Sequence, residues 1–223
     1  ESDADFQIDS TAPTATVTVG TPTIFDNDLV QEVTVTYSEA MKATPTPVIT
    51  FGATTGAWTS NNDGAWDSTQ KIWTESYTIT DANEEATAIV NVSGAKDLAG
   101  NTQTDNSSMT FAVDTKNPTA AITSTKSSPT NVNPIPITIT FSEKVNDFVI
   151  GDITVGNGTA SDLVTSDNIT FTADISPTAD GTVTVDIAAG VATDLAGNNN
   201  TAATQFSIDY DGTPPVLSEV TAV

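Results

Sequence analysis

Two short motifs occur twice in this sequence, in the same order and about one domain length apart. The pentapeptide Asp97–Asn101 (DLAGN) recurs unchanged as Asp194–Asn198, and Tyr37-Ser38-Glu39 recurs as Phe141-Ser142-Glu143. A repeat of this period means that the same structural unit is built twice, with each motif at an equivalent place in both copies. The chain has 223 residues, which is enough for two domains of ordinary size.

A third motif marks where the units begin and end. The pattern Phe-x-(Val or Ile)-Asp, followed a few residues later by Pro, ends at Asp9, Asp114 and Asp209. These three marks bracket two complete units and leave a fragment of the same pattern at each end. The predicted organisation is residues 1–9 as the closing strand of a preceding repeat or a linker, 10–114 as the first domain, 115–210 as the second, and 211–223 as a linker and the opening strand of a following repeat.

Both units show the alternation of apolar and polar residues that is typical of β-strands, and no useful helical periodicity. Thr makes up about a fifth of the chain, and β-branched residues suit a half-buried sheet surface. In the first unit the predicted strands are Ala15–Val19, Gln31–Tyr37, Val48–Phe51, Ile72–Thr80, Thr87–Ser93 and Met109–Asp114. In the second they are Ala120–Ser124, Ile135–Phe141, Phe148–Val155, Ile169–Asp174, Gly181–Ile187 and Thr204–Asp209. With a short further strand in each, the fold class predicted is all-β, two sandwiches of about seven antiparallel strands.

The composition excludes several classes of function. The formal charge is -23, with 29 acidic residues against six basic ones, so the chain has no electrostatic route to nucleic acid or acidic lipid. It contains no His, no Cys and no Arg, which removes the usual proton shuttle, thiolate nucleophile and phosphate clamp. No apolar run is long enough to span a membrane. We therefore predict that the protein is not an enzyme, and that it binds no nucleic acid and does not insert into a membrane.

Taken together, the motifs resemble the bacterial immunoglobulin-like repeats of very large surface adhesins and of other multidomain cell-surface proteins. The order is an entering Asp with a following Pro-Thr, a strand ending in (Phe or Tyr)-Ser-Glu, a late DLAGN loop and a closing Phe-x-(Val or Ile)-Asp strand. The resemblance covers essentially the whole chain and is closer in the second unit. It implies tandem immunoglobulin-like sandwiches that act as structural spacer or extender repeats, outside the cell, with neighbouring repeats of the same polypeptide as partners.

The alternation of strand direction places three separated acidic motifs at one pole of each unit. The predicted groups are Asp9, Glu39 and Asp97 in the first unit, and Asp114, Glu143 and Asp194 at the equivalent positions of the second. Carboxylates gathered in this way repel one another unless a cation lies between them. Ca²⁺ is the hard cation that carboxylate and carbonyl oxygens suit best. The alternative interpretation is that the DLAGN aspartates only shape a turn.

A further acidic loop is predicted at the opposite pole of the first unit. Asp26 and Asp28 have the alternate spacing that lets two carboxylates reach one ion, and Asp81–Glu85 is expected beside them. Together with Asp114 they would form a calcium site at the junction of the two units. The alternative is an ordinary solvated acidic loop.

Two other interpretations stay open. Trp58, Trp66 and Trp73 fall within a short insertion that the second unit lacks, so they either stack on sugars as a carbohydrate-binding module or complete an enlarged core. The terminal strand fragments either belong to neighbouring repeats or pair with other copies by β-strand addition, which would make the protein a subunit of an extracellular filament or surface layer.

Overall fold

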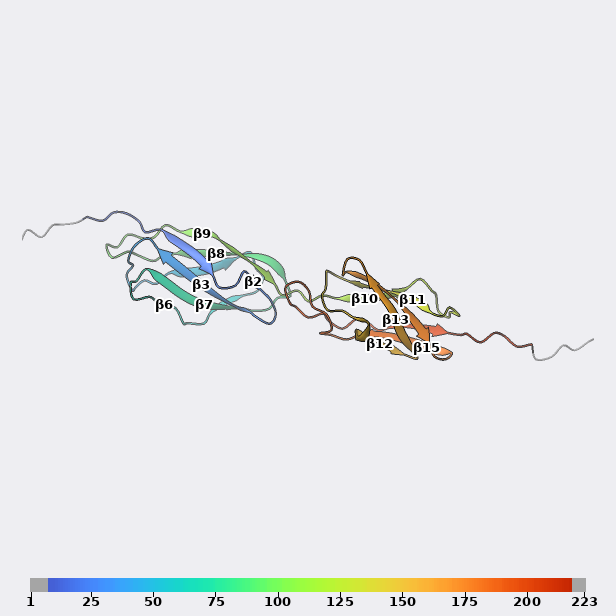
Figure 1. Ribbon diagram of the computed structural model, residues 1–223. Helices are drawn as coiled ribbons and strands as arrows, with labels where there is room; N and C mark the ends of the chain where they lie inside the picture. The colour runs from blue at the N-terminus through green and yellow to red at the C-terminus, as the bar shows by residue number, and fades with distance from the viewer. Residues whose placement is uncertain (1–7, 218–223) are drawn as a thin grey trace, which may run out of the picture. The chain divides into compact units, whose positions relative to one another are not determined.

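The computed structural model describes residues 8–217 of the chain. The contacts within the chain divide it into two compact units, and the boundary lies between Lys116 and Asn117. Figure 1 shows that each unit is built from strands. The terminal strands predicted within residues 1–9 and 211–223 fall largely outside the described part. Its flanking residues, 8–14 and 211–217, form no strand.

The first unit is a sandwich of two sheets. Its strands are β1 (Ala15–Val19), β2 (Thr23–Ile24), β3 (Val30–Tyr37), β4 (Val48–Gly52), β5 (Trp58–Ser60), β6 (Ala65–Trp66), β7 (Ile72–Ile79), β8 (Glu85–Ser93) and β9 (Asn106–Asp114). One sheet has the order β1-β3-β7-β5, with β6 also paired to β7, and the other has the order β2-β9-β8-β4. All pairings are antiparallel except that of β2 with β9, which is parallel.

The second unit repeats this plan. Its elements are β10 (Ala120–Ser124), β11 (Ile135–Phe141), the 3₁₀ turn η1 (Ile150–Asp152), β12 (Ile153–Gly156), β13 (Gly158–Thr165), β14 (Thr170–Pro177), β15 (Gly181–Ile187) and β16 (Phe206–Tyr210). The sheets have the orders β10-β11-β14-β13 and β12-β15-β16. The all-β sandwich predicted from the alternation is confirmed.

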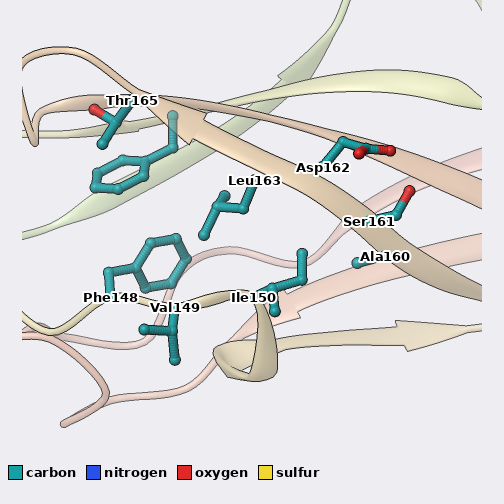
Figure 2. Close-up of a pocket in the computed structure, with 9 residues that line it drawn as sticks. Phe148, Val149, Ile150, Ala160, Ser161, Asp162, Leu163 and Thr165 are labelled. Atoms are coloured by element: carbon teal, nitrogen blue, oxygen red, sulfur yellow. The ribbon is translucent and has the colours of Figure 1, made fainter.

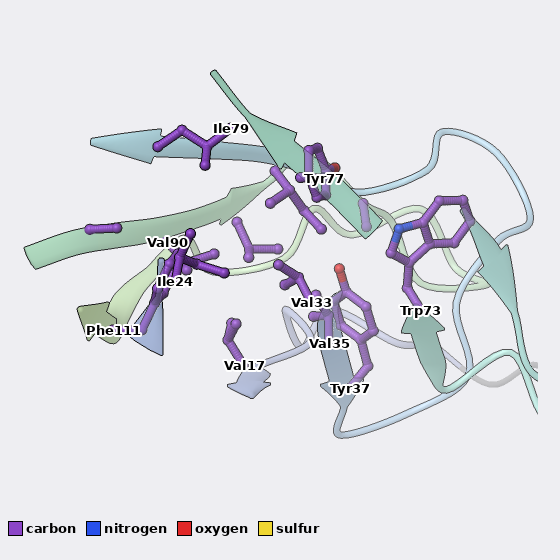
Figure 3. Packing of buried hydrophobic residues seen from close by; sticks show 14 of the residues in the cluster. Val17, Ile24, Val33, Val35, Tyr37, Trp73, Tyr77, Ile79, Val90 and Phe111 are labelled. Atoms are coloured by element: carbon purple, nitrogen blue, oxygen red, sulfur yellow. The ribbon is translucent and has the colours of Figure 1, made fainter. Parts of the chain in front are cut away.

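The core lies between the two sheets of each unit, where alternate residues of every strand meet. On β3, Val33, Val35 and Tyr37 point inward and are at most 3% exposed, while the residues between them face outward. Figure 3 shows these side chains meeting those of β7 and β8 in the first unit. Burial of each such aliphatic side chain stabilises the fold by about 1.5–3 kcal/mol.

The strand prediction was wrong at the edges of the sheets. In the segment predicted as one strand over Phe148–Val155, residues 150–152 instead form η1, and the strand β12 begins only at Ile153. The sequence did not indicate β13, an edge strand whose small and polar residues show little alternation. In the insertion that carries the tryptophans, β5 and β6 both pair with β7, and residues 61–64 connect them, with Asn62 at a φ of 58°.

In each unit a buried amide side chain, Gln103 or Asn200, forms hydrogen bonds that hold the segment after DLAGN in place. In the first, Gln103 accepts a hydrogen bond from the Tyr37 hydroxyl (2.8 Å) and donates to the Val92 carbonyl (3.2 Å). In the second, the aromatic residue is Phe141, which has no hydroxyl, and the shorter Asn200 accepts from the N–H of Ala192 at 2.9 Å. The longer Gln103 side chain thus occurs with the Tyr37 hydroxyl, and the shorter Asn200 side chain occurs with Phe141, which has no hydroxyl.

Candidate metal centres

The DLAGN loop of the first unit is held in shape by its own aspartate. Asp97 is fully buried, and its Oδ1 accepts hydrogen bonds from the N–H groups of Gly100 (2.6 Å) and Asn101 (2.8 Å). Its Oδ2 accepts from the Asn101 side-chain amide at 2.8 Å. Gly100 has a φ of 105°, which a residue with a side chain rarely adopts, so the loop requires glycine there.

The loop of the second unit has the same geometry. Asp194 Oδ1 accepts from the N–H groups of Gly197 (2.7 Å) and Asn198 (2.9 Å), and Oδ2 accepts from the Asn198 amide at 2.8 Å. Gly197 has a φ of 108°. The turn chemistry that was one interpretation of DLAGN is therefore present in both units. These hydrogen bonds use three of the about four lone-pair sites of each carboxylate, which leaves one on Oδ2 for a cation.

Hydrogen bonds of side chains and backbone bring the other acidic residues of the first unit to this loop. The Asn101 side-chain amide donates to the Asp9 carbonyl at 3.1 Å. Ser38 exchanges two hydrogen bonds with Thr14 at the start of β1, one through its N–H (3.0 Å) and one through its hydroxyl (3.1 Å). These contacts fix the chain at Asp9 and next to Glu39, so the entering segment, the end of β3 and the DLAGN loop converge.

The structure brings the predicted triads together. Asp9, Glu39 and Asp97 each offer a carboxylate oxygen, and these oxygens lie within 4.8 Å of one another. The same holds for the second set, Asp114, Glu143 and Asp194. Within the described residues these are the groups of three or more acidic side chains close enough to share an ion.

The separation of the oxygens in the first triad fits Ca²⁺. Two oxygens that each lie about 2.4 Å from one calcium ion are at most about 5 Å apart. Burial alone would raise the pKa of Asp97, but hydrogen bonds from Asn101 and Gly100 outweigh it and lower that pKa, so the carboxylate is ionised at neutral pH. The donor set is all oxygen, as calcium prefers, and carbonyls and water would complete it.

Asp26 and Asp28 are placed differently. Residues 25 and 28 form a β-bridge, with the Asp28 N–H donating to the Phe25 carbonyl at 2.8 Å. Among the described residues, neither aspartate belongs to a group of three acidic side chains. A cation site that uses them stays a prediction.

The acidic loop 81–85 contains a contact that the sequence did not indicate. The Glu84 carboxylate accepts three hydrogen bonds, from the N–H and hydroxyl of Thr55 (2.7 and 2.8 Å) and from the N–H of Gly56 (2.8 Å). Glu84 therefore ties the loop that precedes β5 to the loop that precedes β8. A cluster of acidic residues in sequence gives no sign of which one is used inside the unit.

The three tryptophans pack within the first unit. Trp73 is buried, and Trp58 stacks on Phe51 with ring centroids 4.1 Å apart. Trp66 contacts Tyr37 (5.6 Å) and Trp73 (5.3 Å). These ring contacts favour completion of an enlarged core over an exposed platform for sugars.

Strand order, motifs and ring packing define the chain as two tandem β-sandwiches of the immunoglobulin type. Residues 114–210 match the family model described as bacterial Ig-like domain, so the second unit is a bacterial Ig-like domain. The resemblance predicted from the motifs is confirmed there. The first unit has the same strand plan and the same DLAGN loop. Domains of this family are typically non-enzymatic and often extracellular.

Two solved structures of tandem Ig domains align loosely with the chain. Dpr2 Ig1-Ig2, from its complex with DIP-Theta Ig1-Ig3, is 9% identical, with coverage of 91% of this chain and 100% of that chain and a TM-score of 0.27. A chimeric titin Z1Z2-Z1Z2 tandem, functionalized with a GRGDS peptide from fibronectin, is 12% identical, with coverage of 90% and 96% and a TM-score of 0.24. Scores this low carry no argument about function.

No curated protein matches the chain. Across residues 8–217, no helix has the length and apolar character needed to cross a membrane.

Proposed function

We propose that these domains are structural spacer repeats of a longer extracellular surface protein, and that Ca²⁺ bound at the acidic pole of each domain stabilises them. The proposal is supported by the bacterial Ig-like domain match and by the repetition of one sandwich plan along the chain. Neighbouring repeats of the same polypeptide are the partners that this function requires. A filament assembled by strand addition is a second form of the same structural role, and the oligomeric state of the chain in solution distinguishes the two.

The observation that carries the calcium proposal is the duplicated triad. The same three motifs supply one Asp, one Glu and one buried Asp in each case, with their oxygens within 4.8 Å. A turn alone needs only the aspartate of DLAGN. It does not account for a glutamate and a second aspartate at the same distance in both copies. The repulsion among three carboxylates disfavours the folded state unless a cation offsets it.

The proposed role includes no catalysis. The chain lacks His, Cys and Arg, and the buried aspartates of DLAGN are used to hold their loops. In the first unit, the Asp97 pKa is lowered, so this carboxyl is a poor proton donor at neutral pH.

Thermal unfolding in EGTA and in millimolar Ca²⁺ tests the proposal. A ligand that binds only the folded state at a hundredfold excess over its Kd stabilises by about 2.7 kcal/mol, which raises the Tm of a domain of this size by about 10–20 °C. Tryptophan fluorescence follows the first unit alone, because Trp58, Trp66 and Trp73 all lie there and the second unit has none. Mg²⁺ should substitute poorly, because it demands a smaller, octahedral site.

Two variants separate calcium binding from folding. Glu39→Gln removes one predicted ligand and leaves the hydrogen bonds of the DLAGN loop intact. It should reduce the calcium-dependent rise in Tm while leaving the Tm in EGTA unchanged or higher. Glu32→Gln, on the outward face of β3, is the matched control and should keep the full response. Superimposable melts in EGTA and Ca²⁺ for the unchanged protein would show that the triads are not calcium sites.

A further inference from the structure

The second unit has an open apolar hollow of about 580 Å³ at one edge of its sandwich. It lies between β13 of one sheet and the segment around η1 that leads into the other. Figure 2 shows Leu163 reaching from β13 toward the ring of Phe148, with Val149 and Ile150 across the hollow. The lining includes Phe148, Val149 and Ile150 on one side and Asp162, Leu163 and Thr165 of β13 on the other.

Comparison with the first unit shows why this edge is open. Trp66 on β6 pairs with Trp73 and packs on two aromatic rings of the core. The residue of β13 in the same place is Thr165, which pairs with Phe171. A threonine side chain is far smaller than an indole, so the β13 side of the edge is not filled.

A different segment supplies the missing ring contact in the second unit. Phe148, which precedes η1, lies 5.1 Å from Phe141 and 5.1 Å from Phe171, the equivalents of Tyr37 and Trp73. The ring cluster is therefore complete, but it is reached from the opposite side of the edge. The hollow remains between Phe148 and the small residues of β13.

Apolar side chains around the hollow remain in solvent. Val149 is 56% exposed and Ile150 is 39% exposed. Covering a cluster of exposed branched side chains is favourable by about 25 cal/mol for each Å² removed from water. This surface therefore gains free energy from an apolar side chain inserted between β13 and η1.

The edge itself disfavours an added strand. β13 is the outer strand of its sheet, and its pairing with β14 is interrupted by a bulge between Ser161 and Val164. Within the bulge, Asp162 has a φ of 54°. Bulges and charged residues on an edge strand oppose continuous pairing with another strand. Side-chain insertion fits this edge better than strand addition.

The negative charges around the hollow favour a positively charged ligand. Asp162 is part of the lining, and three other aspartates each lie within two residues of a lining residue in sequence: Asp147 beside Phe148, Asp152 near Ile150 and Asp167 near Thr165. Lys144 is the one nearby cation in the sequence. A second copy of this chain would bring a formal charge of -23 against this surface, whereas a basic segment would be attracted to it.

We propose that the hollow is a docking site for a basic segment of another protein, which inserts one aromatic or branched aliphatic side chain flanked by Lys or Arg. The inserted side chain packs against Phe148 and Leu163, and the flanking cations face the surrounding aspartates. The proposal is independent of calcium, because none of the lining residues belongs to a triad.

An NMR titration of the full chain with short blocked peptides tests the proposal. The probe is acetyl-Lys-Lys-Phe-Lys-Lys-amide, and its controls carry Ala in place of Phe, or Glu in place of each Lys. We expect amide shift changes centred on Val149, Ala160 and Leu163, at least tenfold weaker binding of the Ala peptide and no binding of the Glu peptide. Raising NaCl to 0.5 M should weaken binding without moving its location.

Two tryptophan variants complete the test. Thr165→Trp places in β13 the side chain that the first unit has there, and should weaken the Phe peptide at least tenfold. Thr159→Trp, on the exposed face of the same strand, is the matched control and should bind as the unchanged protein does. If Thr165→Trp disturbs the spectrum of the second unit, Asp162→Asn is used instead and should weaken binding about threefold.

Three results would overturn the proposal. The first is equal affinity for the Phe and Ala peptides with shifts spread over the acidic surface, which indicates charge attraction alone. The second is no shift at the hollow at millimolar peptide. The third is a concentration-dependent shift of the same residues without peptide, which would assign the hollow to a second copy of the chain.

Discussion

The buried hydrogen bond between Tyr37 and Gln103 allows a quantitative test of how the first unit is stabilised. Tyr37 is 3% exposed, and its hydroxyl donates to Gln103 Oε1 over 2.8 Å. In Tyr37→Phe this oxygen still accepts from the Ala95 N–H at 3.3 Å, so it keeps a partner. The loss is that of one neutral hydrogen bond, and we expect the free energy of unfolding to fall by about 1 kcal/mol.

Substitution of the acceptor, Gln103, leaves the Tyr37 hydroxyl without a hydrogen-bond partner. Gln103→Asn shortens the side chain by one methylene, so the Tyr37 hydroxyl stays buried without an acceptor, at a cost of about 2–3 kcal/mol. Tyr37→Phe combined with Gln103→Asn has no orphan hydroxyl and reproduces the Phe141 and Asn200 arrangement of the second unit. The double variant should therefore lose about 1 kcal/mol less than the sum of the single losses.

Urea unfolding at pH 7, followed by tryptophan fluorescence, measures these energies for the first unit alone, because the second unit contains no tryptophan. Burial raises the pKa of Tyr37 well above its ordinary value, so the hydroxyl remains a donor throughout the assay. An unchanged stability in Tyr37→Phe would refute the reasoning. So would strictly additive losses in the double variant, because the two side chains would then not be coupled.

Two further substitutions test contacts of the first unit, one at Glu84 and one at Gly64. Glu84→Gln should cost about 1–2 kcal/mol, a partly exposed group contributing less than the full value of its hydrogen bonds. Burial alone would raise the Glu84 pKa, but hydrogen bonds from Thr55–Gly56 outweigh it, so the folded pKa lies below the ordinary value. The stabilisation that Glu84 provides is therefore fully present above the unfolded pKa of about 4.3 and is lost as pH falls through the folded pKa. Acid titration of urea midpoints should show this loss in the unchanged protein and not in Glu84→Gln. Gly64→Ala would bring a Cβ into the Trp73 ring, so it should cost about 1–3 kcal/mol and change the fluorescence spectrum, whereas Gly52→Ala, whose nearest neighbour would be 3.9 Å away, should do neither.

The sequence by itself determined the repeated plan and the convergence of the first triad. Period-2 alternation identified central strands such as β3 and β11, because a strand buried on one face must alternate. Asp9 and Asp97 are far apart in sequence, yet their proximity in space could be predicted. Alternating strand direction places every second loop at the same pole, so topology alone brings the motifs together.

Only the tertiary structure decided what happens at the edges of the sandwiches. An edge strand is paired on one side, so a strand such as β13 can be built from small and polar residues that carry no periodic signal. The ring contacts that Trp66 makes in the first unit are made by Phe148 in the second, from a segment that does not correspond in sequence. Packing requires a ring at that place but not a particular strand to supply it, and such a choice depends on contacts between residues that are distant in the chain.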